Sequence, residues 1–315
     1  MQNSNDINQL MVSVVIISYN HETYIEKCIE NVLNQTTNFD FEIIISNDCS
    51  KDNTDSVIRD VIKKNNNPSN IRYYNQENNL GMVNNTVFVF KQSKGKYIAI
   101  CDGDDYWTDS LKLQKQVDFM EANNEIVFSF HGAKTLDNNS NFNTYPKNKL
   151  FKNKQIVPKD VFISRGAAYS CTSSIMFQSQ LIHILPNYFT NCFVNDFPLA
   201  LLAISNGEIG YLEDEMTVYR TMADNSWSAI KDKDMIFKEK KFENTMMTLR
   251  DFDEFTNHKY HTLLDNLKSL CSYQLLHSYF SVVKSKKVRF DKYKYYRKKL
   301  NLEHRIKILI KLIIK

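Results

Sequence analysis

The sequence has little glycine, with 7 glycines in 315 residues. It contains neither a G-x-G-x-x-G segment nor a G-x-x-x-x-G-K-[ST] segment. Dinucleotide redox chemistry and P-loop phosphate transfer therefore lose their usual sequence signatures. A phosphate cradle built from glycine backbone is also disfavoured. If the protein binds a phosphate-bearing ligand, a metal ion and a few side chains must neutralise the phosphate charge.

Long apolar runs and paired cysteine motifs are missing as well. The longest clean apolar run, F-P-L-A-L-L-A-I at 197–204, is far too short to cross a bilayer. None of the six cysteines stands in a C-x-x-C spacing, which argues against a zinc knuckle. The first ten residues show no basic region followed by an apolar region, so we expect no secretory signal. A reducing, cytoplasmic location fits these features.

Acidic residues are scarce in the C-terminal tail. Residues 281–315 carry 13 Lys/Arg against 2 Asp/Glu, whereas the rest of the chain carries 27 against 34 (40 minus 13 and 36 minus 2). The body is therefore mildly acidic and the tail strongly basic. In 289–315, Ile306, Leu309, Ile310 and Ile313 fall on one helical face. This pattern is typical of an interfacial helix on an anionic membrane, although a basic helix packed on the body has the same pattern.

Apolar runs alternate with amphipathic segments in the first third of the chain, which indicates an α/β fold. We expect strands at 12–18, 41–46, 71–75 and 96–101. We expect helices between them at 21–35, 52–64 and 82–94. This order predicts a mostly parallel central sheet flanked by helices. The C-terminal ends of such strands share one edge of the sheet, where open α/β folds bind ligands.

The later part of the chain alternates less regularly. We expect further strands at 125–132, 208–214 and 216–221, a strand passing into a helix at 173–180, and a helix at 195–207. From residue 235 onward the pattern is helical, which predicts a helical C-terminal extension.

Three carboxylates follow the fourth expected strand, in the segment Y-I-A-I-C-D-G-D-D-Y-W. Asp102, Asp104 and Asp105 stand within four positions, and like charges so close repel one another. Oxygen ligands in this number suit Mg²⁺ or Mn²⁺, and Mg²⁺ usually needs only one or two protein carboxylates. A single aspartate at such a place is more often a turn or helix-capping residue. Polar groups after all four strands together favour a binding site.

The ordered segments V-S-V-V-I-I-S-Y-N, F-E-I-I-I-S-N-D-C-S, N-L-G-M-V-N-N and C-D-G-D-D-Y-W resemble the family 2 glycosyltransferases, which have the GT-A fold. The resemblance covers about residues 10–225 and is nearest to bacterial members that build surface polysaccharides. It predicts a catalytic domain at 10–228 and a helical, basic extension at 229–315.

The resemblance implies a nucleotide site at the ends of the first three strands. Tyr19 and Asn20 stand where the family contacts the nucleobase, and Glu22 nearby is expected to shape the loop. Asp48 matches the second acidic position of the D-D-G-S motif, which hydrogen-bonds uracil. Asn85, in the N-L-G-M-V-N-N segment, is placed with the nucleotide-binding residues. The sequence departs from the motif in two places, with Asn47 at the first acidic position and Cys49 at the glycine.

The resemblance also implies the metal ligands. Asp102 and Asp104 form the D-x-D pair, with Asp104 as the expected ligand of Mn²⁺ or Mg²⁺. Asp105 is a second candidate ligand, and Asp102 is counted with the nucleotide-binding residues because it is free to hold a ribose hydroxyl. Trp107 is expected to pack beneath the site.

The catalytic base implied by the resemblance is Asp196, in the segment V-N-D-F-P-L-A-L-L-A. From the residues alone, a helix cap before Pro198 is an equal alternative for this aspartate. Arg220 is implied as a diphosphate contact, because guanidinium groups suit phosphate oxygens. Met222 stands where the family often has histidine. His131 is a candidate for the acceptor side or, equally, a core histidine.

The implied reaction is an inverting transfer from a nucleotide diphosphate sugar, expected to be a UDP-sugar, to a hydroxyl of a glycan or lipid-linked acceptor. No nucleic acid partner is expected. A processive synthase is disfavoured because membrane spans and a Q-x-x-R-W motif are missing. Two alternatives stay open. A nucleotidyltransferase would share the fold and the metal, and a catalytically inactive binding module is suggested by Asn47, Cys49 and Met222.

Overall fold

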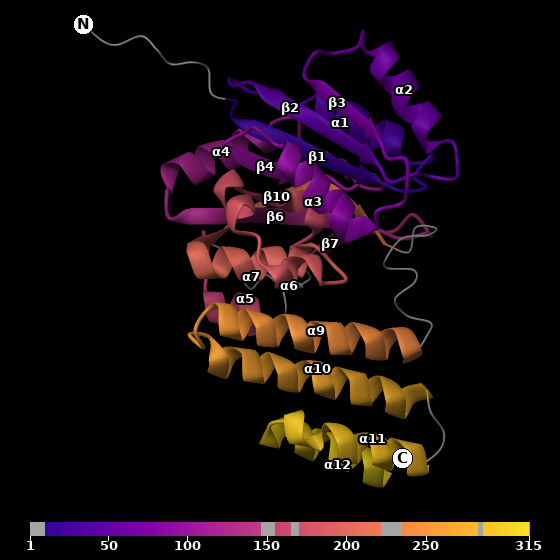
Figure 1. Cartoon of the computed structure of the whole chain (residues 1–315), viewed down its shortest axis with the longest axis vertical. Coiled ribbons are helices and arrows are strands. Elements are labelled where there is room, and N and C mark those ends of the chain that lie inside the picture. The colour runs from indigo at the N-terminus through magenta and orange to yellow at the C-terminus, as the bar shows by residue number, and fades with distance from the viewer. Residues whose placement is uncertain (1–9, 146–154, 165–169, 222–234, 283–285, 315) are drawn as a thin grey trace, which may run out of the picture.

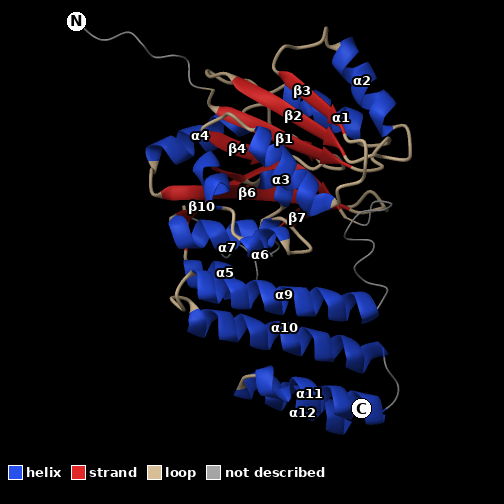
Figure 2. Cartoon of the chain, in the orientation of Figure 1, coloured by secondary structure: helices blue, strands red, loops and turns tan. Residues whose placement is uncertain are grey.

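The structure is a computed structural model that describes residues 10–145, 155–164, 170–221, 235–282 and 286–314. Figure 1 shows a sheet-containing body at the N-terminal end and a stack of helices that leads away from it toward the C-terminus. The same view coloured by secondary structure separates these two parts clearly (Figure 2).

The N-terminal half of the sheet is parallel, as expected. Its strands are β1 (Val12–Ser18), β2 (Phe41–Asn47), β3 (Ile71–Asn75) and β4 (Tyr97–Ile100). The connecting helices are α1 (Ile25–Leu33), α2 (Thr54–Lys64) and α3 (Met82–Gln92). The strands lie in the order β3-β2-β1-β4 and pair in parallel. β1, β2 and β4 are mainly apolar and almost wholly buried, which is typical of parallel strands covered by helices, whereas β3 at the edge of the sheet is partly exposed.

The other half of the sheet is mixed. Its strands are β5 (Tyr106–Trp107), β6 (Ile126–Leu136), β7 (Phe142–Tyr145), β8 (Ile156–Val157), β9 (Met176–Gln178) and β10 (Glu208–Arg220). The sheet continues from β4 as β9-β6-β10-β5, with β9 antiparallel to both of its neighbours. Strands β6 and β10 pair in parallel over most of their length.

The remaining described helices cover the sheet or extend from it. They are α4 (Lys112–Ala122), α5 (Lys159–Ser164), α6 (Asn187–Thr190), α7 (Asp196–Asn206), α9 (Met235–Phe255), α10 (His261–Val282), α11 (Lys286–Tyr296) and α12 (Leu302–Ile314). Short 3₁₀ turns occur at η1 (Thr172–Ser174), η2 (Ser179–Ile184) and η3 (Arg297–Lys299).

Four of the expected elements are built differently in the structure. The two short strands at 208–214 and 216–221 are one strand, β10, whose pairing with β6 shifts register around Glu215. A bulge of this kind interrupts the apolar alternation, and the sequence therefore suggested a break. The first helix begins at Ile25 rather than at residue 21, because 21–24 form a turn. The segment at 173–180 forms a 3₁₀ turn, strand β9 and the start of a second 3₁₀ turn.

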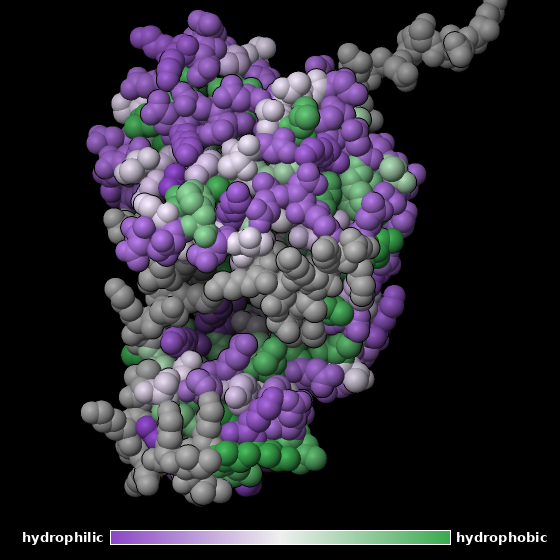
Figure 3. All heavy atoms as spheres, turned by 180° about the vertical axis from the view of Figure 1, so that it is seen from behind, coloured by the Kyte–Doolittle hydropathy of each residue, from purple (hydrophilic) through white to green (hydrophobic). Residues whose placement is uncertain are grey.

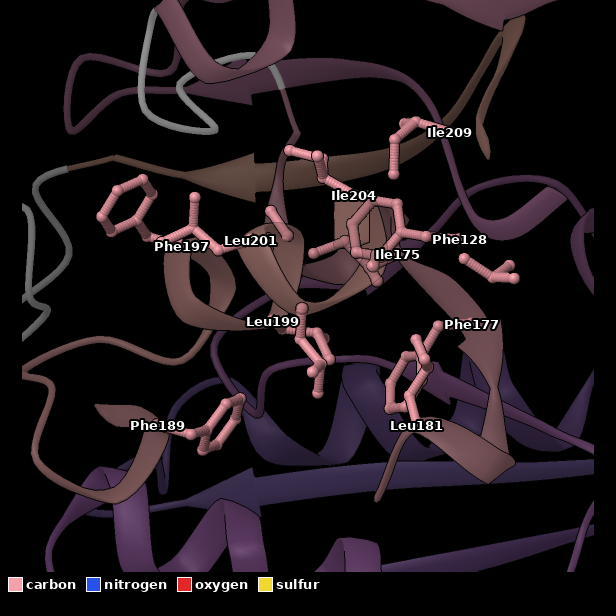
Figure 4. Close-up of a cluster of buried hydrophobic side chains, with 14 of the residues drawn as sticks. Phe128, Ile175, Phe177, Leu181, Phe189, Phe197, Leu199, Leu201, Ile204 and Ile209 are labelled. Carbon is pink, nitrogen blue, oxygen red and sulfur yellow. The ribbon is translucent and has the colours of Figure 1, made fainter. Parts of the chain in front are cut away.

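The two faces of the sheet carry separate cores. Val14 and Ile16 of β1 pack in the cluster covered by α1, α2 and α4, whereas Val15 packs in the cluster that contains α3 and α7. This split follows from the alternation of side chains along a strand. Figure 4 shows part of the second cluster, in which Leu199 and Leu201 of α7 lie with aromatic side chains of neighbouring elements.

The C-terminal helices do not form a wholly separate core. Leu249 of α9 and Leu264 of α10 belong to the same buried cluster as α7. A third cluster joins α9 and α10 to α11 and α12, and includes Phe242, Tyr296 and Ile308. The division of the chain at residue 228 stays a prediction. None of the helices in the described part of the chain combines the length and apolar character that a membrane span requires.

Candidate active site

The loops after β1, β2 and β4 meet at one edge of the sheet. Ser18 at the end of β1 is in register with Asn47 at the end of β2. The chain after β4 continues beside β1, because the Gly103 N–H donates to the Ile17 carbonyl oxygen at 3.0 Å. A Cβ at Gly103 would lie 2.8 Å from His21 Nδ1 and 2.9 Å from that carbonyl oxygen, so only glycine fits without movement. Asp102 and Asp104 flank this glycine and are therefore held at the sheet edge.

The loops after β1 and β2 are joined through Asn20. Its backbone N–H donates to Ser50 Oγ at 2.9 Å, and its Oδ1 accepts the Lys51 N–H at 2.8 Å. Asn20 and Cys49 both have a φ of 57°, in the left-handed region that favours glycine and asparagine. Cys49 thus keeps the backbone conformation of the motif glycine that it replaces. Tyr19 is 40% exposed on the same loop.

Glu22 joins the same two loops from the solvent side. One carboxylate oxygen, Oε2, accepts both the backbone N–H of Asn53 and its side-chain amide, each at 2.8 Å. Asp52 accepts the backbone N–H and the hydroxyl of Thr54, at 3.1 and 2.6 Å. These bonds satisfy amides at the start of α2. Glu22 therefore shapes the loop, and its place among nucleotide contacts stays a prediction.

Asp48 is buried and holds the loop after β3. Its Oδ1 accepts the Leu80 N–H at 2.6 Å, and its Oδ2 accepts the Gly81 N–H at 3.0 Å. Burial raises the pKa of Asp48, while these two hydrogen bonds lower it. Because each carboxylate oxygen can accept a second hydrogen bond, both backbone contacts leave Asp48 able to accept a further N–H.

Asn85 lies on α3 and is 1% exposed. Its Oδ1 accepts the Ser46 hydroxyl at 2.5 Å, and its amide donates to the Ser46 carbonyl oxygen at 3.3 Å. The side chain therefore ties α3 to β2 directly. A role in nucleotide binding stays a prediction for this residue.

The three carboxylates after β4 have different surroundings. Asp105 is 1% exposed, and both of its oxygens are engaged: Oδ2 accepts the Ser173 hydroxyl at 2.6 Å and Oδ1 accepts the Arg220 N–H at 2.9 Å. Burial, followed by the charges of Asp104 and Asp102, raises the pKa of Asp105 well above its usual range. Asp102 and Asp104 are partly exposed. Asp105 thus fixes the loop from the buried side, while Asp102 and Asp104 keep part of their surface exposed.

Ser173 links this loop to η1. Besides donating to Asp105, its hydroxyl accepts the Asp102 N–H at 3.1 Å, and its carbonyl oxygen accepts the Trp107 indole N–H at 2.8 Å. Trp107 is fully buried beneath the loop, as the sequence suggested. The sequence analysis missed Ser173, since a serine 68 positions from its carboxylate partner carries no local signal.

Asp196 opens α7 and lies near the carboxylates of the loop. The pKa of Asp102 is raised to about 8, first by burial and then by the charges of Asp104 and Asp196. Asp196 Oδ1 accepts the Phe197 N–H at 2.7 Å, and the cap position is Asn195, whose amide donates to Thr86 Oγ1 at 2.6 Å. A bound divalent cation would relieve the mutual repulsion of these acids, so the residues present fit a metal ion.

Cationic side chains lie beside the acidic loop. The Arg220 guanidinium is 4.9 Å from the Tyr24 ring centroid and 5.0 Å from that of Tyr106, and its Nε is buried without a hydrogen bond to any described residue. Lys27 Nζ is 3.7 Å from the Tyr106 ring centroid. Lys27 is itself exposed on α1. Met222 lies outside the described residues.

Two basic side chains are buried below the site. Lys112 is fully buried, its Nζ is 3.9 Å from the Trp107 ring centroid, and burial lowers its pKa to about 7. His131 is also buried, and its Nδ1 faces the Gly132 carbonyl oxygen at 2.7 Å. Burial and the Lys112 charge lower the pKa of His131 to about 3, so its ring is neutral. This geometry agrees with a core histidine.

Taken together, the mixed sheet and its flanking helices define a fold of the GT-A type. The sequence profile described as "Glycosyl transferase family 2" matches residues 13–178, and the chain belongs to that family.

Similar sequences include proteins with and without an assigned pathway. An uncharacterized protein of Mycobacterium tuberculosis is 31% identical over 227 residues, which cover 70% of this chain and 62% of that protein. The match thus spans less than two thirds of that relative. The putative teichuronic acid biosynthesis glycosyltransferase TuaG of Bacillus subtilis is 26% identical over 235 residues, which cover 73% of this chain and 88% of TuaG.

Two solved structures have the same fold. TarS 1–349 of S. aureus in complex with UDP-GlcNAc superposes with a TM-score of 0.61 at 16% identity, covering 92% of this chain and 88% of TarS 1–349. The mannosyltransferase PcManGT of Pyrobaculum calidifontis, in complex with GDP-Man and Mn²⁺, superposes with a TM-score of 0.56 at 14% identity, covering 96% and 84%. At these identities the likeness shows the fold alone.

Proposed function

We propose that this chain is an inverting, metal-dependent glycosyltransferase that moves a sugar from a UDP-sugar to a hydroxyl of a glycan or lipid-linked acceptor in surface polysaccharide synthesis. One observation supports this most strongly: Asp196 from α7 lies close enough to Asp102 for its charge to raise the pKa of that carboxyl. A carboxylate from a distant segment therefore lies near the acidic loop after β4. The sequence similarity to TuaG, a putative teichuronic acid biosynthesis glycosyltransferase, supports a role in surface polysaccharide synthesis.

Asp104 is the proposed metal ligand, and Asp102 is proposed to hold a ribose hydroxyl. Asp105 is a weaker candidate ligand, because it is buried and already accepts hydrogen bonds from Ser173 and the Arg220 backbone, whereas Asp104 is partly exposed. A bound Mn²⁺ or Mg²⁺ would neutralise the diphosphate and stabilise the leaving nucleotide. The Arg220 guanidinium, whose Nε lacks a described partner, is proposed to contact the diphosphate as well.

Asp196 is proposed to act as the general base. It would accept the proton of the acceptor hydroxyl, whose oxygen attacks the anomeric carbon on the face opposite the departing nucleotide. It lies at the start of α7, is partly exposed, and its charge reaches Asp102 in the acidic loop. The acceptor oxygen then forms the new glycosidic bond as the bond to the diphosphate oxygen breaks, so no glycosyl-enzyme is needed.

Sugar-dependent UDP release tests this function. Purified protein with Mn²⁺, a panel of UDP-sugars and an acceptor fraction of bacterial glycolipid should release UDP only when donor and acceptor are both present. An inactive binding module would bind the donor without acceptor-dependent UDP release. A nucleotidyltransferase would instead release pyrophosphate from a nucleoside triphosphate.

We predict a preference for uracil over guanine and adenine. The Asp48 carboxylate keeps lone pairs that can accept the uracil ring N–H, a donor that adenine lacks and guanine also has, so this contact separates UDP from ADP and the preference over GDP rests on the family resemblance. UDP should bind more tightly than GDP or ADP in calorimetry, and Asp48→Asn should weaken UDP binding by roughly tenfold, the value of one charge-assisted hydrogen bond. Asp60→Asn, an exposed change on α2, is the control. Tighter binding of GDP would contradict the assignment.

We also propose that α12 lies against the cytoplasmic face of an anionic membrane. Its exposed apolar side chains follow a helical spacing on one face: Leu302, Ile306, Leu309 and Ile310. Ile308, on the other side, is buried in the C-terminal core. Figure 3 shows hydrophobic side chains gathered at the lower edge of the molecule, where α11 and α12 lie. The basic residues of 289–315 supply the electrostatic attraction.

Vesicle flotation tests this contact. The protein should float with vesicles of phosphatidylcholine and phosphatidylserine at low salt and less with phosphatidylcholine alone. The double variant Ile306→Glu, Leu309→Glu should bind at least about tenfold more weakly, since burying each apolar side chain is worth about 1.5–3 kcal/mol. Phe142→Glu, an exposed change on β7 in the body, should bind normally. Equal flotation of all three proteins would refute the contact.

A further inference from the structure

A second group of metal-ligating side chains lies at the junction of α9 and α10, in helices that the proposed catalytic site does not use. His261 Nδ1 is 2.7 Å from Asp253 Oδ2, and His258 Nδ1 is 3.2 Å from the same oxygen. The three ligand atoms all lie within 4.8 Å of one another, and no other such group of His, Cys, Asp and Glu occurs among the described residues.

The backbone of the junction brings the two imidazoles together. Asn257 and His258 have φ angles of 48° and 62°, which is uncommon for residues other than glycine. The His258 N–H donates to the Asp253 carbonyl oxygen at 2.8 Å and so ends α9 in a tight turn. His261 then begins α10 on the same side of the junction. The spacing of 253, 258 and 261 does not fit one helical face, and the turn is what makes the three side chains converge.

Asp253 contributes a buried carboxylate to this cluster, with the histidines on its Oδ2. The residue is 5% exposed, and its Oδ1 is buried without a hydrogen bond to any described residue. A buried carboxylate oxygen without a partner is unusual, because its desolvation is not compensated. The two histidines converge on this carboxylate from the solvent side, with side chains that are 67% and 55% exposed.

Asp265 provides the support that a metal-binding histidine usually has. Its Oδ2 lies 3.4 Å from His261 Nε2, one helical turn farther along α10. Without a metal ion, His261 Nδ1–H donates to Asp253, and when an ion takes the place of that proton the Asp265 carboxylate would hold the ring proton on Nε2. Asp265 therefore lies where an outer carboxylate partner of a metal-bound His261 is needed.

We propose that Asp253, His258 and His261 bind one divalent transition metal ion of the Zn²⁺ type. Two imidazoles with one carboxylate suit Zn²⁺, whereas Mg²⁺ prefers oxygen ligands. Ligands about 2.0–2.2 Å from a tetrahedral zinc ion lie about 3.3 Å from one another, so small ring movements suffice. The fourth position faces solvent. The ion would tie the end of α9 to the start of α10, beside Tyr260, whose hydroxyl donates to the Ile204 carbonyl oxygen at 3.1 Å.

The competing explanation is a hydrogen-bonded charged cluster that caps the helix end without any metal. The two explanations differ in how Zn²⁺ binding responds to substitution. Full-length protein stripped with a chelator should be titrated with Zn²⁺ by calorimetry, in excess Mg²⁺ so that the catalytic carboxylates are occupied. We expect one saturable equivalent. His258→Gln and His261→Gln should each weaken it at least about 100-fold, and Asp265→Asn about tenfold, as for an outer-shell partner.

Two controls make the outcome unambiguous. His183→Gln changes an exposed histidine outside the cluster and should bind Zn²⁺ normally. Asp104→Asn should also keep the Zn²⁺ equivalent and the rise in unfolding temperature that Zn²⁺ produces by binding the folded state. Co²⁺ should give the absorption bands of a histidine-ligated ion in the parent and not in His258→Gln. Unchanged Zn²⁺ affinity in both histidine variants, loss of the equivalent in Asp104→Asn, or no saturable binding would overturn the proposal.

Discussion

Asp196→Asn is expected to lower sugar transfer by about 10²–10⁴-fold, the usual contribution of a general base. The variant keeps the shape of the side chain and an oxygen that can accept the Phe197 N–H, so the start of α7 should be unchanged. It loses only the basicity needed to accept the proton of the acceptor hydroxyl. UDP affinity should stay close to that of the parent, because the base acts on the acceptor and not on the nucleotide.

The measurements are steady-state transfer, UDP binding by calorimetry and thermal unfolding of the same preparation. Asp118→Asn, which changes an exposed aspartate on α4, is the matched control and should transfer sugar at the parent rate. Near-parent transfer by Asp196→Asn would mean that Asp196 is only a helix-terminal residue. Loss of UDP binding together with transfer would place Asp196 in the donor site instead.

The parallel half of the sheet was predictable because its strands are continuous apolar runs of seven residues or fewer, each followed by an amphipathic helix. Such a local pattern needs little information from distant residues. The other half was less predictable. β5 has two residues, and β9 lies between β4 and β6 although it follows both in sequence. Pairings of this kind depend on long-range packing, which leaves little trace in local periodicity.

The sequence located the acidic loop but could not separate the roles of its members. Asp104 and Asp105 are neighbours with the same side chain, and the resemblance admits both as metal ligands. The structure distinguishes their surroundings, since Ser173 and Arg220 approach Asp105 from η1 and β10. Those partners are 68 and 115 residues away in the chain, so no local pattern indicates them.

The burial of Lys112 was not predicted, for a related reason. Lys112 opens α4 in a polar stretch where a lysine normally faces solvent, and its complete burial beside Trp107 follows only from how α4 packs on the sheet. The metal-type cluster of Asp253, His258 and His261 was also not anticipated. Its members lie on both sides of a helix break, and the left-handed turn that joins them is not evident from residue types.

Asp104→Asn is expected to lower Mn²⁺-dependent transfer by about 10²–10³-fold, which corresponds to the several kcal/mol that a bound cation contributes to charge stabilisation. It should also lower UDP affinity in the presence of Mn²⁺, and high Mn²⁺ concentrations should restore part of both. The free energy of unfolding should be unchanged or slightly higher. Asp104 is partly exposed, and its negative charge repels those of Asp102 and Asp105, whose pKa values it helps to raise.

Asp105→Asn is the matched comparison, because it removes the same charge one position away. Its amide NH₂ would face either the Ser173 hydroxyl or the Arg220 N–H, both of which now donate to the carboxylate. One buried donor would then lose its acceptor, at a cost of about 1–3 kcal/mol in the free energy of unfolding. We therefore expect Asp105→Asn to lower stability first and Asp104→Asn to lower metal-dependent binding first. If Asp104→Asn binds UDP with the parent's Mn²⁺ dependence while a folded Asp105→Asn does not, Asp105 is the metal ligand and binds the ion through lone pairs that its two hydrogen bonds leave free.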